Sequence, residues 1–296
     1  MVGIERNTSS IEAVFRGNGY VTDPSIVTAL HLVQNLQKPL LVEGPAGVGK
    51  TEIAKVLAIS LNTKLIRLQC YEGLDVNSAL YEWNYAKQML HIRLTENSVA
   101  TVAEREADIF SKDFLLSRPI LQAFMEETAP PVLLIDEIDR ADEAFEAFLL
   151  EALAEFQITI PELGTIQAKH RPYVILTSNR TRELGDALRR RCLYQWVSYP
   201  DVKKEAAILQ ARLPDIDAQL AQQIAALMVN IRQMPLQKVP GVAESLDWAQ
   251  ALMSMHRSEL NKVTVQETLG CFLKNYDDWE TVEQELQQGT LLHSNA

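Results

Sequence analysis

The sequence predicts an α/β fold in which a parallel sheet carries a phosphate-binding loop and an all-helical second domain follows. A glycine-rich loop, Gly44–Thr51, stands between an apolar run and a helical pattern. Two further apolar runs, 132–135 and 173–176, end in polar residues, as parallel strands do at a ligand-binding edge. Beyond residue 200 only helical spacing is evident.

The glycine-rich loop has the pattern G-x4-G-K-[ST] in the strand–loop–helix setting that this pattern requires. Its glycines let N–H groups face phosphate oxygens, and the first helical turn adds its positive dipole end. Lys50 is expected to reach the β- and γ-phosphates of ATP, and the Thr51 hydroxyl to bind Mg²⁺. The predicted nucleotide-binding residues of the loop are Gly44, Pro45, Ala46, Gly47, Val48, Gly49, Lys50 and Thr51.

The composition is that of a globular protein, with 47% apolar and 23% charged residues in a chain of 296. No apolar run reaches the roughly 18 residues of a membrane span, and the first 16 residues lack the apolar core of a signal peptide. Three well-separated cysteines fit a reducing cytosol rather than disulfides or a zinc site. A net charge of −11 disfavours nonspecific binding to nucleic acid. We expect a cytoplasmic protein.

Two segments beside the loop are less clear. Tyr20 and Val21 precede a helix that starts at Pro24, and they are candidates for backbone contacts to adenine. A plain N-terminal loop is an equally good interpretation. After a strand at 65–69, about sixty residues contain a short helix within 71–80, an aromatic stretch without helical spacing, and helical spacing through Val102, Ile109 and Leu115. We interpret them as an insertion between the second and third strands.

The run Val132–Ile135 ends in Asp136 and Glu137, as expected of a central strand that delivers carboxylates to its carboxyl end. Asp136 is placed to hold Mg²⁺ through its water shell. Glu137 would orient and deprotonate the attacking water. The strand at 173–178 delivers Asn179, which we expect to bind the γ-phosphate or that water, although a turn-capping asparagine is the competing account.

A helix and a hairpin separate these two strands. The helix has a core stripe from Phe145 to Phe156, and the hairpin pairs 156–160 with 165–168 around a Pro-Glu-Leu-Gly turn. Seven cations against two acids then lie between Gly164 and Arg191, and they end in three consecutive arginines. Such a patch can neutralise phosphate, or can merely end a helix in solvent. Its cations are Lys169, Arg171, Arg180, Arg182, Arg189, Arg190 and Arg191.

Tyr199–Asp201 marks a boundary, which predicts a nucleotide-binding domain over 1–199 and a helical domain over 200–296. The order of the motifs resembles an AAA+ ATPase, and the run 136–141 with the hairpin resembles the MoxR family. The segments 69–73, 81–85 and 176–184 are similar to its CoxD-like members. This resemblance implies a P-loop AAA+ parallel-sheet sandwich with a helix-2 insertion, a hairpin before sensor 1 and an all-helical lid domain.

The resemblance further implies a homo-hexameric ring with ATP at subunit interfaces and an arginine finger supplied in trans. The family pattern Leu-x-Arg followed by an aromatic residue gives Arg191 when its last two residues are matched to Arg191-Cys192. It gives Arg190 when its leucine is matched to Leu188, and we prefer Arg191. MoxR members usually act as chaperones in metal-cofactor insertion with a von Willebrand factor A partner, here a separate polypeptide. CoxD-like members are associated with maturing the molybdenum–copper centre of carbon monoxide dehydrogenase, so a metalloenzyme client is implied.

One departure concerns the lid, where the family often has a sensor 2 arginine. The matching region, 241–246, contains none. Either another residue senses the γ-phosphate, or lid closure is weakly coupled to hydrolysis. Two other functions stay open: a nucleic-acid-dependent motor of the helix-2-insert clade, and a nucleotide-gated scaffold. The acidic, apolar hairpin tip disfavours the motor, and Glu137 with the arginines disfavours the scaffold.

Overall fold

The computed structural model describes residues 8–96, 101–289 and 291. The chain forms two compact units, which we describe separately. The sheet unit comprises residues 28–43 and 57–195. The loop–lid unit comprises the residues up to 27, the segment 44–56 and the residues from 196 onward. The predicted domain boundary at residues 199 and 200 stays a prediction.

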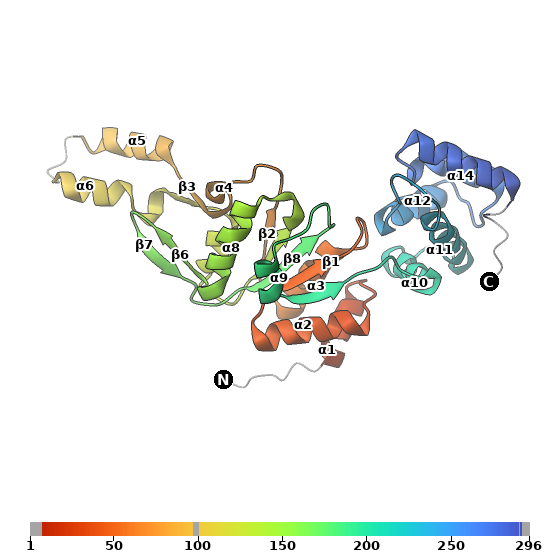
Figure 1. Ribbon diagram of the computed structural model, residues 1–296, viewed down its shortest axis with the longest axis horizontal. Helices are drawn as coiled ribbons and strands as arrows, with labels where there is room; N and C mark the ends of the chain where they lie inside the picture. The colour runs from red at the N-terminus through yellow and green to blue at the C-terminus, as the bar shows by residue number, and fades with distance from the viewer. Residues whose placement is uncertain (1–7, 97–100, 290, 292–296) are drawn as a thin grey trace. The chain divides into compact units, whose positions relative to one another are not determined.

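A mainly parallel sheet confirms the predicted α/β class (Figure 1). Its strand order is β2-β5-β8-β1-β9, and β2, β5, β8 and β1 pair in parallel. β1 and β5 are unbroken apolar runs until their last, acidic residue, as expected because all residues of both strands are buried. The strands are β1 (Leu40–Glu43), β2 (Leu65–Gln69), β5 (Val132–Asp136), β8 (Tyr173–Ser178) and β9 (Leu193–Trp196).

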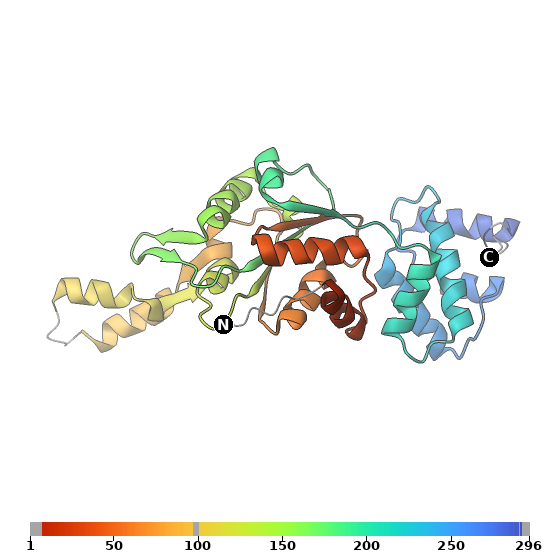
Figure 2. The same cartoon turned by 90° about the horizontal axis from the view of Figure 1, so that it is seen from below.

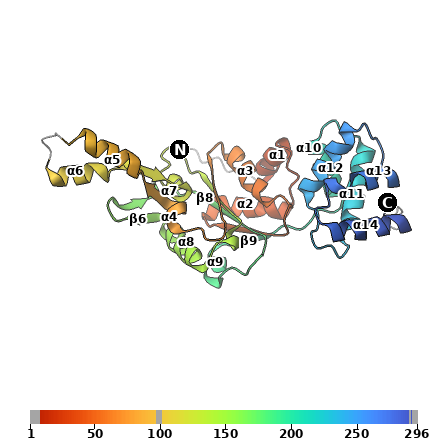
Figure 3. The same ribbon diagram turned by 90° about the horizontal axis from the view of Figure 1, so that it is seen from above.

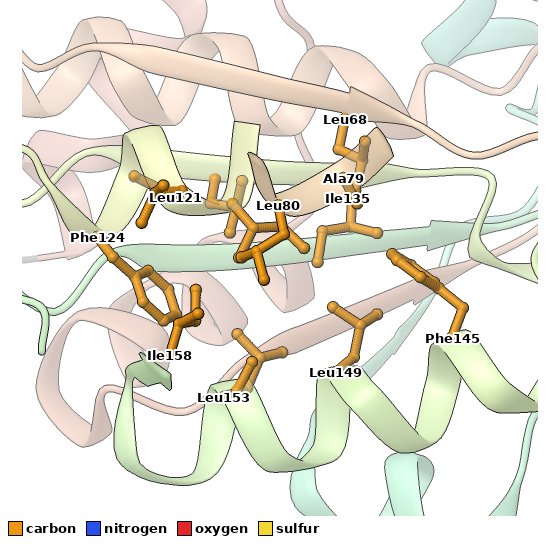
Figure 4. Packing of buried hydrophobic residues seen from close by; sticks show 14 of the residues in the cluster. Leu68, Ala79, Leu80, Leu121, Phe124, Ile135, Phe145, Leu149, Leu153 and Ile158 are labelled. Carbon is orange, nitrogen blue, oxygen red and sulfur yellow. The ribbon is translucent and has the colours of Figure 1, made fainter. Parts of the chain in front are cut away.

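The helix α8 (Glu143–Glu155) supplies much of the core of the sheet unit. In Figure 4, Phe145, Leu149 and Leu153 point from α8 towards the sheet residue Ile135. Burying each such side chain contributes about 1.5–3 kcal/mol. Other members of the cluster come from α4 (Val76–Leu80), α7 (Pro119–Phe124) and the hairpin, and include Ala79, Leu80, Leu121, Phe124 and Ile158.

The insertion forms a two-stranded sheet and a helical arm. Strands β3 (Tyr81–Trp83) and β4 (Leu115–Ser117) pair antiparallel. The arm consists of α5 (Tyr85–Leu94) and α6 (Val102–Ile109), which lie side by side in Figures 1 and 3, and of the short 3-10 helix η1 (Lys112–Phe114). The short helix expected within 71–80 and the helix through Val102 and Ile109 are confirmed. Leu115 is in a strand rather than a helix, because it pairs with Trp83.

The helix α5 could not be predicted from its sequence pattern, because it is amphipathic in the reverse sense. Tyr85, Met89 and Leu94 are exposed by 66%, 55% and 75%, whereas Gln88 is buried. Gln88 donates from Nε2 to Ile109 O at 2.7 Å, and His91 Nε2 lies 2.6 Å from Asp108 Oδ2. These polar bonds, together with contacts of His91 and Lys87 with the Phe114 ring, hold α5 to the rest of the arm.

The predicted hairpin is confirmed as β6 (Gln157–Ile160) and β7 (Gly164–Gln167), with Ile158 opposite Ile166. A 3-10 turn, η2 (Ile138–Arg140), links β5 to α8. The short helix α9 (Asp186–Arg191) carries the three consecutive arginines. The predicted strand with its acidic end, the helix, the hairpin and the second buried strand are therefore all present in the sheet unit.

The loop–lid unit begins with α1 (Thr8–Gly17), which was not predicted, and the start of α2 (Pro24–Leu36), which begins at the predicted proline. The segment 44–56 holds the phosphate loop and the start of α3 (Lys50–Leu61). Five helices and the 3-10 turn η3 (Leu269–Cys271) then pack around one apolar cluster that includes Trp248 and Phe272. The ribbons of these helices lie together at the blue end of the colour scale in Figure 2. The helices are α10 (Val202–Arg212), α11 (Ala218–Arg232), α12 (Val242–Ser254), α13 (Lys262–Thr268) and α14 (Tyr276–Gln288).

Between residues 200 and 289 the structure is helical, as predicted, and contains no strand. Among the described residues, no helix has the length and apolar character needed to cross a bilayer.

Candidate functional site

Three parallel strands bring the predicted site residues to one edge of the sheet. In the order β5-β8-β1, Leu134 pairs with Ile175, and Glu43 pairs with Ser178, so the carboxyl ends of the strands coincide. Asp136 ends β5, Asn179 follows β8, and the phosphate loop follows β1 directly in the chain. This is the edge at which open α/β sheets bind ligands.

The phosphate loop has the backbone that its glycines predict. Gly47 and Gly49 have φ values of 76° and 88°, which disfavour a side chain. The Lys50 ammonium folds back over the loop and donates to Gly44 O at 2.8 Å and Pro45 O at 2.6 Å. Lys50 is also the first residue of α3, so it joins the loop to the positive end of that helix.

Asp136 is almost fully buried, and both of its carboxylate oxygens have partners. Oδ1 accepts from Thr177 Oγ1 at 2.5 Å, and Oδ2 accepts from Arg67 Nε at 3.0 Å and Nη2 at 2.6 Å. Mg²⁺ takes oxygen ligands and usually keeps several waters, and a buried carboxylate at this edge of the sheet is a ligand of that kind. The donor set therefore fits Mg²⁺ held through water.

Glu137 adopts the left-handed backbone conformation, with φ 56° and ψ 49°. A residue with a side chain is disfavoured there by about 1–2 kcal/mol, so the surroundings must hold it. Its N–H donates to Thr177 Oγ1 at 2.9 Å, and Arg140 Nε lies 2.8 Å from its Oε2. Backbone and side chain are therefore both anchored.

Asn179 lies where β8 leaves the sheet, and it is half-buried. Its N–H donates to Asp139 Oδ1 at 3.2 Å, while Asp139 Oδ2 accepts from Thr181 N at 2.8 Å and Oγ1 at 2.7 Å. Asp139 is buried and thus fixes the loop that presents Asn179.

Cys70 follows β2 at this edge of the sheet and has carboxylates as neighbours. Burial, and then the neighbouring carboxylates of Asp136, Asp139 and Glu137, raise the pKa of the Cys70 thiol to about 12. Cys70 therefore stays protonated and is no nucleophile at neutral pH.

Tyr20 lies beside the phosphate loop, since a methyl group on Gly49 would be 3.9 Å from its ring. Its ring meets Phe15 edge-on, and burial raises the pKa of its hydroxyl. The N–H of Tyr20 donates to Phe15 O at 3.0 Å, so a backbone contact from Tyr20 to adenine would use its carbonyl. The half-buried Val21 is next in the chain, and both residues stay predictions.

The two finger candidates differ in their surroundings. The Arg191 guanidinium donates to Leu150 O within its own chain. The Arg190 side chain is 84% exposed, and its Nη2 lies 4.0 Å from Asp186 Oδ2. Elsewhere in the basic patch, Arg182 is structural, because it donates to Ala141 O and pairs with a buried glutamate.

Main-chain atoms join the phosphate loop to the lid helix α12. Val242 N donates to Gly47 O at 2.9 Å. A methyl group added to Gly241 would lie 2.6 Å from Gly47 Cα, which is too close for any real side chain. Arg232, an arginine near this point, has a buried side chain that forms an ion pair with Glu205.

Sequence reasoning gave no site role to Arg67 or Thr177, and it used Asp139 only as part of the family motif. The sequence also predicted that the strand at 65–69 is largely buried. This prediction is wrong, because only Leu68 of β2 is buried and the Arg67 side chain is 50% exposed. Arg67 pairs with Asp136 from this exposed position, so no burial of its charge could have indicated the partner. Thr177 gave no signal of a site role either, since threonine is common in strands.

Residues 39–192, more than half of the chain, match the protein family described as AAA domain (dynein-related subfamily). An uncharacterized protein of Staphylococcus haemolyticus (strain JCSC1435) is 27% identical over 230 residues, which span 74% of this chain and 78% of that protein. An uncharacterized protein of Staphylococcus aureus (strain bovine RF122 / ET3-1) is 27% identical over 229 residues, spanning 73% and 76%.

Similar solved structures include RuvB, the Holliday junction branch migration motor of Thermotoga maritima. It has a TM-score of 0.47 at 21% identity, covering 86% of this chain and 69% of that chain. A RuvB point mutant reaches a TM-score of 0.50 at 20% identity, covering 88% and 72%. At this identity the likeness to the mutant concerns the fold alone.

Proposed function

Because the chain belongs to the AAA family, in its dynein-related subfamily, and is an ATPase, we propose that it is a MoxR-type chaperone that couples ATP hydrolysis to remodelling of a client protein. One observation supports hydrolysis most directly: Asp136, Glu137 and Asn179 converge at the edge of the sheet where the phosphate loop begins. A loop for phosphates, an acid for the metal and a base for water are the parts that phosphoryl transfer to water requires.

In this proposal the loop N–H groups and Lys50 bind the triphosphate, and Thr51 and Asp136 hold Mg²⁺. The metal neutralises charge on the β- and γ-phosphates. Glu137 accepts a proton from the attacking water, and the Asn179 amide orients that water or the γ-phosphate. Catalysis is then mainly positioning and electrostatic stabilisation.

The proposed assembly is a homo-hexameric ring in which a neighbouring subunit supplies the arginine finger. An arginine supplied in this way is worth roughly 10³–10⁵ in rate in other nucleotidases. The exposed Arg190 has more freedom to reach a neighbour than Arg191, which is held at Leu150. The structure therefore supports Arg190, whereas the preferred motif match supports Arg191.

The client is proposed to be a metalloenzyme of the molybdenum carbon monoxide dehydrogenase type, matured together with a separate von Willebrand factor A protein. The similarity of 69–73, 81–85 and 176–184 to CoxD-like chains supports this. The experiment is to isolate the Glu137→Gln variant with ATP, which should hold ATP and client together. Recovery of a metalloenzyme subunit with an A-domain protein supports the proposal, whereas recovery of nucleic acid supports the motor. Equal ATP hydrolysis by wild type and Glu137→Gln contradicts the hydrolytic mechanism and leaves the nucleotide-gated scaffold.

A further inference from the structure

Thr177, on β8, makes two hydrogen bonds through one hydroxyl, to the last residue of β5 and to the residue that follows it. Its Oγ1 accepts from the Glu137 N–H at 2.9 Å and donates to Asp136 Oδ1 at 2.5 Å. The side chain is 1% exposed. One buried hydroxyl thus fixes the backbone of the proposed base and the carboxylate of the proposed metal acid at the same time.

Asp139 makes the reverse connection, from the turn after β5 to the loop after β8. Its carboxylate accepts from the Asn179 N–H at 3.2 Å and from the Thr181 N–H and hydroxyl at 2.8 and 2.7 Å. The hydroxyl of Thr177 on β8 therefore holds the backbone of Glu137, and the carboxylate of Asp139 after β5 holds the backbone of Asn179.

We propose that Thr177 and Asp139 form a reciprocal clamp that sets the Glu137 carboxylate and the Asn179 amide at the distance needed to hold one water between them. The inference rests on the proposed hydrolytic function. Both are positioning residues, because neither has to touch the nucleotide. The conformation of Glu137 supports the proposal: a glutamate persists at φ 56° only where its surroundings hold it, and Thr177 bonds the N–H of that residue.

The main test is Thr177→Val, which removes the hydroxyl while keeping the shape of the side chain. Outer-shell partners of this kind typically change activity by about 10- to 100-fold, and we expect kcat to fall by that factor. The affinity for ATP measured without Mg²⁺ should change little, because the phosphate loop is untouched and Asp136 is proposed to act on ATP only through the metal. Thr177→Ser should recover most of kcat, since it restores the hydroxyl.

A matched control is Thr268→Val in α13. Thr268 is also buried, and its hydroxyl also accepts one bond, from Trp248 Nε1 at 2.8 Å, and donates another, to Thr264 O at 2.7 Å. Thr268→Val should lower the melting temperature by about as much as Thr177→Val does, but it should leave kcat unchanged. An equal fall of kcat in this control would show a general loss of stability and overturn the proposal.

A double-mutant cycle separates positioning from structure. In a Glu137→Gln background the clamp has no base to position and only its bond to Asp136 is left to lose. Thr177→Val should therefore reduce the residual kcat by much less than the factor of about 10 to 100 expected in wild type. Additive losses, or a Thr177→Val enzyme with wild-type kcat, would overturn the clamp. A Glu137→Gln enzyme with wild-type kcat would instead contradict the proposed function. If Thr177→Val does not fold, Asp139→Asn takes its place in the cycle, with the same outcomes.

Discussion

Glu137 combines an unfavourable backbone conformation with the proposed catalytic carboxylate. Left-handed φ and ψ values cost a glutamate about 1–2 kcal/mol relative to glycine, and the Thr177 bond offsets part of this cost. Local strain of this kind is common at functional sites, where the side chain cannot be replaced by one that suits the backbone better.

A comparison of two variants that both lose the carboxylate isolates this strain. We predict that Glu137→Gly is more stable than Glu137→Gln by about 1 kcal/mol, because glycine adopts φ 56° without a steric cost. Both variants lose the ion pair with Arg140, so that contribution cancels. Urea denaturation of the two proteins side by side measures the difference, and an equal or lower midpoint for Glu137→Gly contradicts the prediction.

Arg67 stabilises a carboxylate that is almost fully buried. We predict that Arg67→Gln lowers the free energy of unfolding by about 1.5–3 kcal/mol, because Asp136 would keep its burial and lose a charged donor. Arg118→Gln is the control, since its ion pair with Glu82 is half-exposed and such pairs contribute about 0–1 kcal/mol. Similar effects of the two substitutions in urea denaturation would show that Arg67 is not needed to hold Asp136.

Glu126 gives the protein a pH-dependent stability. Hydrogen bonds from Lys64 and then Thr128 lower the pKa of Glu126 from 4.5 to about 2. A lowered pKa adds stability that is fully present above pH 4.5 and is lost as the pH falls towards 2. The melting temperature of wild type should therefore exceed that of Glu126→Gln by a constant margin at neutral pH, and this margin should shrink below pH 4.5. Lys64→Met should show the same trend, and a margin that grows on acidification would reverse the assignment.

At the scale of elements, the contact between the phosphate loop and α12 depends on two glycines. We predict that Gly241→Ala destabilises the protein by about 1–3 kcal/mol and weakens ATP binding, because the new methyl group would lie 2.6 Å from Gly47 Cα. Gly17→Ala in α1 is the control, since no atom outside its chain neighbours and the backbone of its own helix lies within 4 Å of the added group. Calorimetric unfolding and ATP titration of both variants provide the measurement, and wild-type ATP affinity in Gly241→Ala would refute the prediction.

The elements that could be predicted from the sequence are those with a local signal. Each of three features could be predicted from a segment of about a dozen residues. These are the apolar stripe of α8, the buried apolar runs of β1 and β5, and the glycines of the phosphate loop. The helix α5 could not be predicted, because its apolar side chains face outward and its buried position is a glutamine.

Long-range polar bonds were equally hidden from the sequence. Arg67 and Asp136 are 69 positions apart, and Thr177 lies 41 positions beyond Asp136, so only the sheet register brings them together.

At the scale of the whole molecule, the finger determines whether the site is complete within one subunit. We predict that alanine at the true finger, Arg190 or Arg191, lowers kcat by roughly 10³–10⁵, whereas alanine at the other position has a much smaller effect. Steady-state ATPase assays of the two single variants measure this. Equal, small losses in both would exclude α9 as the source of the finger.

Mixing subunits tests whether the finger acts in trans. Lys50→Ala subunits lack the phosphate lysine but keep their arginines, whereas a variant with alanine at 190 and 191 has the reverse defect. Mixed rings would contain interfaces in which one subunit supplies Lys50 and its neighbour supplies the arginines. The mixture should therefore hydrolyse ATP faster than either protein alone. A mixture no faster than its parts contradicts the shared site.

The antiparallel pairing of β3 with β4 has a consequence for protein engineering. Because Trp83 pairs with Leu115, the chain leaves for the helical arm and returns at adjacent points of one small ladder. The pairing of β3 with β4 does not restrict the length of the segment between the two strands. Foreign segments grafted there, or shorter versions of this segment, should leave the catalytic strands in register.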